Sequence, residues 1–175
     1  MKFKGTLIAV SDMGKSRRFY NDVLGLKTEA DFGANIMLEG GVFLQTLETW
    51  KGFIRDRQVD FAGNDCELYF EEADMEDFLN RLRQHEIAYV HEPIEHSWGQ
   101  TAVRFYDPDG HIIEVAEEID RVAQRFVDSG MKEEETAARM GVPVDFVRGC
   151  LSRRKLPIER IEELTTLMAG DGRLK

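Results

Sequence analysis

One pattern occurs twice in this chain, and the repetition limits its possible folds more than any other feature. Residues 6–27 read TLIAVSDMGKSRRFYNDVLGLK, and residues 66–90 read CELYFEEADMEDFLNRLRQHEIAYV. Each copy has an apolar, strand-like run, an Asp-Met pair whose Asp suits a helix N-cap, and apolar residues at helical spacing. The two capping residues, Asp12 and Asp74, set a register between the copies. The sequence therefore predicts two equivalent strand–helix units.

Three extended segments follow each predicted helix. They read LKTEADF, ANIMLEG and GVFLQTLE in the first copy, and IAYVHEP, TAVRFYD and HIIEVAE in the second. Each half is therefore predicted to be a βαβββ unit. A single unit would leave one face of its sheet uncovered, so two must combine. The predicted fold class is α+β, with two βαβββ units forming curved sheets around a cavity and an all-helical extension at the C-terminus.

The distribution of charge predicts where the extension begins. Residues 1–118 hold 12 Lys and Arg against 23 Asp and Glu, whereas residues 119–175 hold 11 against 10. We place a domain boundary between residues 118 and 119. The net charge of −10 argues against general binding to nucleic acid or to an anionic membrane.

The extension contains a segment that resembles a helix-turn-helix. ETAARMGVPVDFVRGCLSRR, within residues 133–155, has Gly141 at the turn and ends its second helix in basic residues. One alternative is a ligand-sensing transcription regulator that binds DNA through this segment. The other is a helical cap that docks on the sheet domain or on a partner. Because the extension carries almost no positive excess, nucleic acid is the less favoured partner. A further helix is predicted from IERIEELTTLMAG, after Pro157.

Cysteine content and the first residues bear on location. Cys66 and Cys150 give neither a disulfide framework nor zinc-ligand spacing. The apolar run in MKFKGTLIAV is too short for a signal or spanning segment, so we expect a cytoplasmic protein with no membrane partner.

Two motifs give the sequence a family resemblance. VSDMGKSRRFYNDVLGLK and RFYDPDGHIIEVAE resemble the opening and closing motifs of the vicinal oxygen chelate superfamily, and the likeness extends over residues 2–118. This superfamily includes glyoxalase I, fosfomycin-resistance thiol transferases, extradiol dioxygenases and bleomycin-binding proteins. The resemblance implies a homodimer, a small-molecule substrate or ligand, and a divalent metal held by four side chains in the cavity.

Carrying the four metal positions onto this chain gives an unusual set of ligands. They fall on Gly5, Gln45, Glu67 and Glu114, where the family usually has His and Glu. Gly5 has no side chain to contribute, so the resemblance implies a site built from two carboxylates, one amide and water. Such an oxygen-rich site suits Mg²⁺, Mn²⁺ or Ca²⁺ better than Zn²⁺.

The function inferred from these residues leaves three possibilities open. The first is a glyoxalase-like enzyme, of lyase, isomerase or transferase type, with Glu67 and Glu114 holding the metal or moving a proton. The second is a metal-free binding protein of the bleomycin-sequestering kind. The third is the regulator described above. Without metal, the two carboxyl groups are expected either to share a proton or to be solvated.

Four other side chains are candidates for substrate binding: Tyr69, Trp98, Arg104 and Tyr106. Arg104 has two interpretations, because it suits an anionic substrate group and equally an acidic neighbour in this acidic domain. Residues 91–100, HEPIEHSWGQ, are predicted to form a loop at the mouth of the cavity. His91 is assigned no role, and His111 is excluded as a ligand because strand alternation points it away from Glu114.

Overall fold

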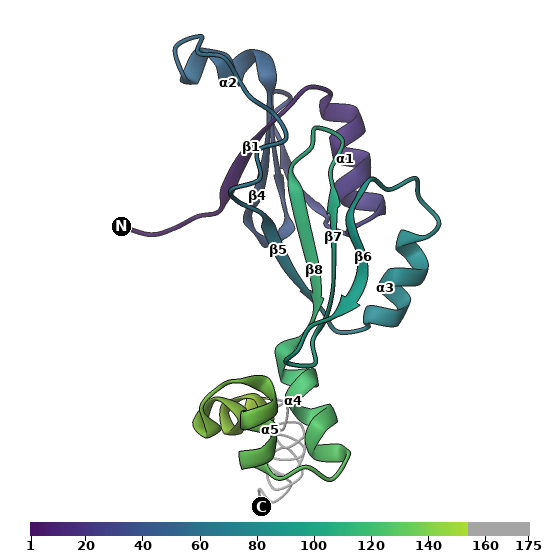
Figure 1. Cartoon of the computed structure of the whole chain (residues 1–175). Coiled ribbons are helices and arrows are strands. Elements are labelled where there is room, and N and C mark those ends of the chain that lie inside the picture. Colours follow the sequence, from purple (N-terminus) through teal and green to yellow (C-terminus); the bar gives the residue numbers. More distant parts are fainter. Residues whose placement is uncertain (154–175) are drawn as a thin grey trace, which may run out of the picture. The chain divides into compact units, whose positions relative to one another are not determined.

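The computed structural model describes residues 1–153, which divide into two compact units (Figure 1). The first contains residues 1–70, 75–93 and 103–115, and holds most of both sheets. The second contains residues 71–74, 94–102 and 116–153, where the described helices of the extension lie.

The two halves of the sheet region have the same topology. The first sheet consists of β1 (Thr6–Val10), β2 (Thr28–Asp31), β3 (Asn35–Leu38) and β4 (Val42–Thr46), in the order β1-β4-β3-β2. The second consists of β5 (Leu68–Glu72), β6 (Tyr89–Glu95), β7 (Thr101–Tyr106) and β8 (Ile112–Glu117), in the order β5-β8-β7-β6. Helix α1 (Met13–Asp22) follows β1, and α3 (Met75–Leu82) follows β5. The predicted pair of βαβββ units is confirmed.

The first helix begins directly after the capping residue that the sequence indicates. The Asp12 side chain accepts a hydrogen bond from the backbone N–H of Lys15, at 2.9 Å, which satisfies a donor that the helix itself leaves free. After α1, Gly25 adopts a positive φ of 72°, a conformation that glycine takes at little cost.

Apolar side chains from both sheets and from the two helices form one core. Its largest buried members include Tyr20 of α1, Phe78 of α3 and Phe105 of β7. Alternate residues of the strands point into this core, among them Val103, Phe105, Ile113 and Val115. Their neighbours in sequence therefore lie on the opposite face of the second sheet.

Two elements differ from the sequence prediction. Residues 47–53, expected to be extended at their start, form helix α2 (Leu47–Phe53). Residues 91–93, predicted both as the end of an extended segment and as the start of a loop, belong to β6, which continues to Glu95. Pro93 is tolerated there because β6 is the edge strand of its sheet, where a missing N–H breaks no inner ladder.

The second unit contains the predicted helices of the extension as far as the structure describes them. They are α4 (Ile119–Asp128), α5 (Glu133–Met140) and a helical segment over residues 144–153. Gly141 has the left-handed conformation expected at the turn, with φ 69°. Val122, Phe126 and Val147 belong to a separate apolar core. The helix predicted from IERIEELTTLMAG, and the basic pair Arg154-Lys155, lie outside the described residues.

None of the helices within residues 1–153 is both long enough and apolar enough to cross a membrane.

Candidate functional site

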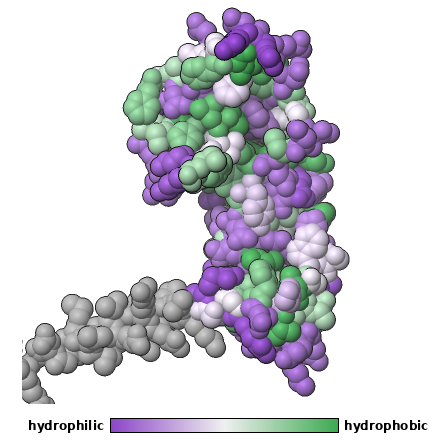
Figure 2. All heavy atoms as spheres, turned by 90° about the vertical axis from the view of Figure 1, so that its left-hand side faces the viewer, coloured by the Kyte–Doolittle hydropathy of each residue, from purple (hydrophilic) through white to green (hydrophobic). Residues whose placement is uncertain are grey.

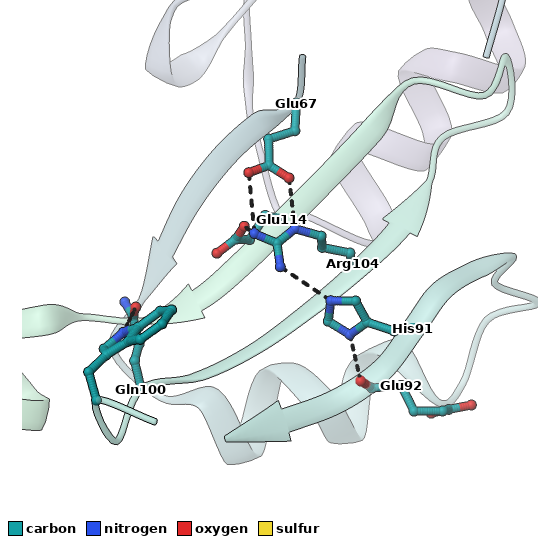
Figure 3. Close-up of polar contacts among 7 residues, drawn as sticks. Glu67, His91, Glu92, Gln100, Arg104 and Glu114 are labelled. Carbon is teal, nitrogen blue, oxygen red and sulfur yellow. Dashed lines mark hydrogen bonds and ion pairs between the residues drawn. The ribbon is translucent and has the colours of Figure 1, made fainter. Parts of the chain in front are cut away.

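A guanidinium group lies between the two carboxylates that the sequence singles out (Figure 3). Arg104 Nε donates to Glu67 Oε2 at 2.8 Å, and Arg104 Nη2 donates to Glu67 Oε1 at 3.4 Å. The same Nη2 also donates to Glu114 Oε2. The two acids therefore converge on one guanidinium, and the positive charge between them belongs to the chain itself. The sequence leaves two interpretations of Arg104 open, and the structure shows its pairing with neighbouring acids.

His91 completes this group of side chains. Arg104 Nη1 donates to His91 Nε2 at 3.3 Å, while His91 Nδ1 donates to the carbonyl of Glu92 at 2.8 Å (Figure 3). The sequence gives His91 no role, because it indicates no partner for this side chain. Because β6 is the edge strand beside β7, His91 lies next to Arg104; the signal in the sequence is the extended segment IAYVHEP, which contains His91.

The four residues come from four neighbouring strands of the second sheet. Glu67 immediately precedes β5, Glu114 lies on β8, Arg104 on β7 and His91 on β6, which is also the order of the strands. Since the residues flanking Glu114 and Arg104 pack in the core, these polar side chains share the other face. We call Glu67, His91, Arg104 and Glu114 the Arg104 cluster.

The environment separates the pKa values of the two acids. Hydrogen bonding to Arg104 lowers the pKa of Glu67, whose side chain is 33% exposed. Burial, together with the nearby Glu67 carboxylate, raises the pKa of Glu114 in spite of its contact with Arg104. The Glu114 side chain is only 7% exposed, so its charge has little water to solvate it. The cluster thus pairs a more readily ionised acid with a more readily protonated one.

The first sheet does not bring Gln45 to this cluster. The Gln45 amide nitrogen donates to the carbonyl of Ala34 at 2.9 Å and to Thr49, and its oxygen accepts from Asn35 at 2.9 Å. In the strand pairing, Gln45 lies opposite Ala9. Gly5 immediately precedes β1, and an added Cβ there would be 1.9 Å from the carbonyl oxygen of Gly41. The amide of Gln45 therefore serves the packing of its own half.

The remaining predicted binding residues lie in different places. Tyr69, two residues after Glu67, is 51% exposed. Tyr106 is half-buried at the end of β7, and its N–H donates to the carbonyl of Ala88 at 2.8 Å. Trp98 belongs to the second unit, where it donates to Gln100 at 3.0 Å and stacks on His96 at a ring separation of 4.2 Å.

The side chains as they lie do not fit a divalent ion. Arg104 occupies the position between Glu67 and Glu114, and Gln45 makes its hydrogen bonds elsewhere. In the described part of the chain, no three His, Cys, Asp or Glu side chains are grouped so that they would hold a metal. Metal binding by Glu67 and Glu114 stays a prediction, and it requires Arg104 to move away.

Comparisons with known proteins agree with this fold. A family model described as a glyoxalase-like domain matches residues 3–120. A crystal structure of a protein of unknown function from Agrobacterium tumefaciens str. C58 is 35% identical, with a TM-score of 0.62, and the match covers 67% of this chain and 94% of that one. No curated protein matches this chain.

Two further solved structures share the fold at low sequence identity. A glyoxalase-related enzyme from Fulvimarina pelagi is 20% identical, with a TM-score of 0.58, over 67% of this chain and 88% of that one. A glyoxalase/bleomycin resistance protein/dioxygenase family enzyme from Burkholderia phytofirmans PsJN is 14% identical, with a TM-score of 0.57, over 65% and 96%. Through residues 3–120, this chain belongs to the glyoxalase-like domain family of the vicinal oxygen chelate superfamily.

Proposed function

We propose that this protein is a glyoxalase-like enzyme that moves a proton on a small carbonyl compound and uses Arg104 where its relatives would use a metal ion. The observation that carries the proposal is the guanidinium placed between two carboxylates on the face of the second sheet away from the core. A fixed cation at that point is suited to the negative charge that develops on oxygen when a neighbouring C–H bond is broken.

Each acid of the Arg104 cluster has a distinct part in this chemistry. Glu67, with its lowered pKa, is ionised and would take the proton from the carbon next to the carbonyl. Arg104 would donate a hydrogen bond to the resulting enolate oxygen. Glu114, with its raised pKa, is the group better suited to return a proton, and proton exchange with water, which reaches the partly exposed Glu67, then resets both acids. Two acids can take these different roles only if their environments shift their pKa values in opposite directions. The pKa of Glu67 is lowered and that of Glu114 is raised.

Isotope exchange tests the proposal without knowledge of the natural substrate. The protein would be incubated in D₂O with hydroxyacetone, dihydroxyacetone and methylglyoxal, and deuterium incorporation next to the carbonyl followed by ¹H NMR. We expect exchange above the buffer rate with at least one of them. Glu67→Gln should reduce the protein-dependent rate by about 10²-fold or more, the usual contribution of a positioned base.

The controls separate the arginine mechanism from a metal mechanism. Glu29→Gln, on the exposed strand β2, removes a carboxylate outside the cluster and should leave the rate unchanged. Exchange that requires added Mn²⁺, is abolished by EDTA and survives Arg104→Met would instead support chelation by Glu67 and Glu114. Absence of exchange with all three compounds would contradict the proposal.

A metal-free binding protein is the second candidate, and exposed apolar side chains favour it. Leu7, Phe32 and Tyr69 are 36%, 70% and 51% exposed. Figure 2 shows apolar residues grouped on one face of the unit that carries the sheets, with hydrophilic residues around them. Exposed apolar surface of this kind is typical of binding sites for ligands or partners.

We also propose that the protein is a homodimer, and the same exposed apolar residues support this proposal. Leu7 alternates with the core residue Ile8 and therefore points away from the core of its own chain. We expect sedimentation equilibrium to give twice the mass of one chain, and Leu7→Glu to shift the protein toward the monomer. Glu29→Gln again serves as the matched surface control. A wild-type protein that stays monomeric at about millimolar concentration would contradict the dimer.

Binding to DNA remains the less favoured use of the second unit. Arg148, on the second helix of the helix-turn-helix-like segment, pairs with Glu133 at 2.8 Å and with Asp145 at 3.1 Å. Arg153 pairs with Asp120 at 2.6 Å. Arginines engaged in this way must break an ion pair before they bind a phosphate, so we place protein contacts ahead of nucleic acid for this unit.

A further inference from the structure

A cavity of about 300 Å³ lies in the first unit. The segment between the two halves forms part of its wall through Asp60, Phe61 and Asp65, and strands β1 and β8 contribute Ile8 and Ile112. The volume is at the lower end of the range for small-molecule sites. Glu67 is the one member of the Arg104 cluster that lines it.

The wall that the connecting segment forms is held in place by close packing. Ala62 has a positive φ of 58°, and it lies against Gly110 in the turn before β8. A Cβ at Gly110 would be 3.0 Å from the Cβ of Ala62, so the two backbones approach as closely as glycine permits.

An oriented imidazole faces this cavity. His111 lines it, and Nδ1 of its ring lies 2.8 Å from Oδ2 of Asp107, whose side chain is fully buried. The same Oδ2 accepts from the Tyr20 hydroxyl at 2.9 Å, and Oδ1 accepts the backbone N–H of His111 at 2.8 Å. Since an ionised carboxylate only accepts, the Nδ1 of neutral His111 carries the proton, and Nε2 presents a lone pair. Among residues 1–153, Nε2 has no hydrogen-bond partner.

Three carboxylates line the cavity, of which Glu67 also accepts from Arg104, and Asp60 accepts from Gln58 at 2.7 Å. Asp60, Asp65 and Glu67 accept hydrogen bonds when ionised, as does neutral His111, and no lysine or arginine of the described chain lines the cavity. The apolar part of the wall, with Ile8, Phe61 and Ile112, suits a hydrocarbon body. These carboxylates disfavour carboxylates and phosphates as ligands and favour an ammonium group.

We propose that this cavity binds a small primary amine, with its ammonium N–H groups donating to His111 Nε2 and to the surrounding carboxylates and its apolar body against Phe61 and the two isoleucines. Asp107 is a positioning residue here, because it fixes the ring orientation and the tautomer of His111. The site shares Glu67 with the Arg104 cluster, but amine binding requires no turnover there.

Protonation of His111 opposes this binding. Burial favours the neutral ring, but the hydrogen bond to Asp107 and the carboxylates of Asp107 and Asp109 raise the pKa of His111. Asp60, Asp65 and Glu67 face the same space from the cavity wall. Below its pKa, His111 carries a proton on Nε2 and a positive charge, so it repels an ammonium group. Amine binding therefore strengthens as the pH rises through the pKa of His111.

Calorimetric titration of the full chain with benzylamine, benzyl alcohol and benzoate tests the proposal. We expect benzylamine alone to bind, and to bind more tightly at about pH 8 than at about pH 6, the range in which histidine titrates. Asp65→Asn and His111→Phe should each weaken binding by about three- to fivefold, the effect of losing one partly exposed ion pair or hydrogen bond. Glu29→Gln should leave the affinity unchanged.

The alternatives give distinct results. Equal binding of benzyl alcohol or benzoate, or affinity unaffected by Asp65→Asn, would overturn the amine site. Thermal unfolding of each variant identifies loss of folding, and Asp65→Asn, in an exposed segment, tests the site even if His111→Phe unfolds. Because calorimetry measures binding directly, failure to bind benzylamine would not contradict the proposed proton transfer. Absence of isotope exchange would likewise not contradict the amine site.

Discussion

Asp107→Asn is expected to lower the free energy of unfolding by about 3–5 kcal/mol, the usual cost of breaking a buried charged pair. Asparagine keeps an oxygen for the backbone N–H groups of Asp109 and His111, which donate to Oδ1 at 3.0 and 2.8 Å. At the second position it places an N–H₂ group against the Tyr20 hydroxyl and the His111 ring. The Tyr20 side chain is fully buried and has no water to replace the lost acceptor.

The effect of Asp107→Asn should depend on pH in a definite direction. Burial opposes ionisation of Asp107, but the hydrogen bond and the charge of His111 lower the pKa of Asp107 below its ordinary value. Its contribution is therefore present above the unfolded-state pKa and is lost as the pH falls through the folded-state pKa. The pKa of His111 is raised, so the contribution of His111 is lost as the pH rises through it. The difference between wild type and variant should be largest from about pH 4 to about pH 6.5.

Urea titrations at several pH values measure this difference, and the same turn provides the control. Asp109 is half-buried and accepts from the backbone N–H of Ser11 at 3.1 Å and from the Ser16 hydroxyl at 3.4 Å, and asparagine keeps one accepting oxygen for them. Asp109→Asn should therefore cost no more than about 1 kcal/mol. Equal losses for the two variants would show that the Tyr20–Asp107–His111 network contributes nothing beyond an ordinary turn.

The fold of the sheet region was predictable because its signals are local and occur twice. Asp12 caps a helix through its own nearest turn, and the alternation in HIIEVAE separates core from surface without knowledge of any partner strand. Two copies in one register make each of these inferences a check on the other.

The site was predictable only in part, because the sequence of a single segment does not determine how one strand aligns with the next. Gln45 was chosen by residue type, whereas the position of β4 against β1 depends on a turn in which Gly40 and Gly41 both have positive φ, at 79° and 82°. That turn places Phe43, not Gln45, opposite Leu7 near Gly5. His91 was missed for a related reason, since its role depends on the edge strand β6 lying beside β7.

Arg104→Met should destabilise the protein by about 3 kcal/mol near neutral pH, because it leaves two carboxylates facing each other with one of them buried. Glu114 is 6% exposed, so its charge would have neither a partner nor adequate solvent. Removal of the cation raises the pKa of Glu114 further. The folded state then binds a proton more readily than the unfolded state, and stability increases as the pH falls. The double variant Arg104→Met/Glu114→Gln should recover most of the loss at neutral pH.

The same variant decides whether a metal and Arg104 compete for one position. If the guanidinium occupies the place between Glu67 and Glu114, added Mn²⁺ should raise the melting temperature of Arg104→Met and leave that of the wild type unchanged. Adding Glu114→Gln to the Arg104→Met variant should remove the Mn²⁺ effect, because one carboxylate and one amide bind a hard cation weakly. Equal stabilisation of the wild type and Arg104→Met by Mn²⁺ would mean that the ion binds without displacing Arg104, and a metal-assisted mechanism would then take precedence over the arginine mechanism.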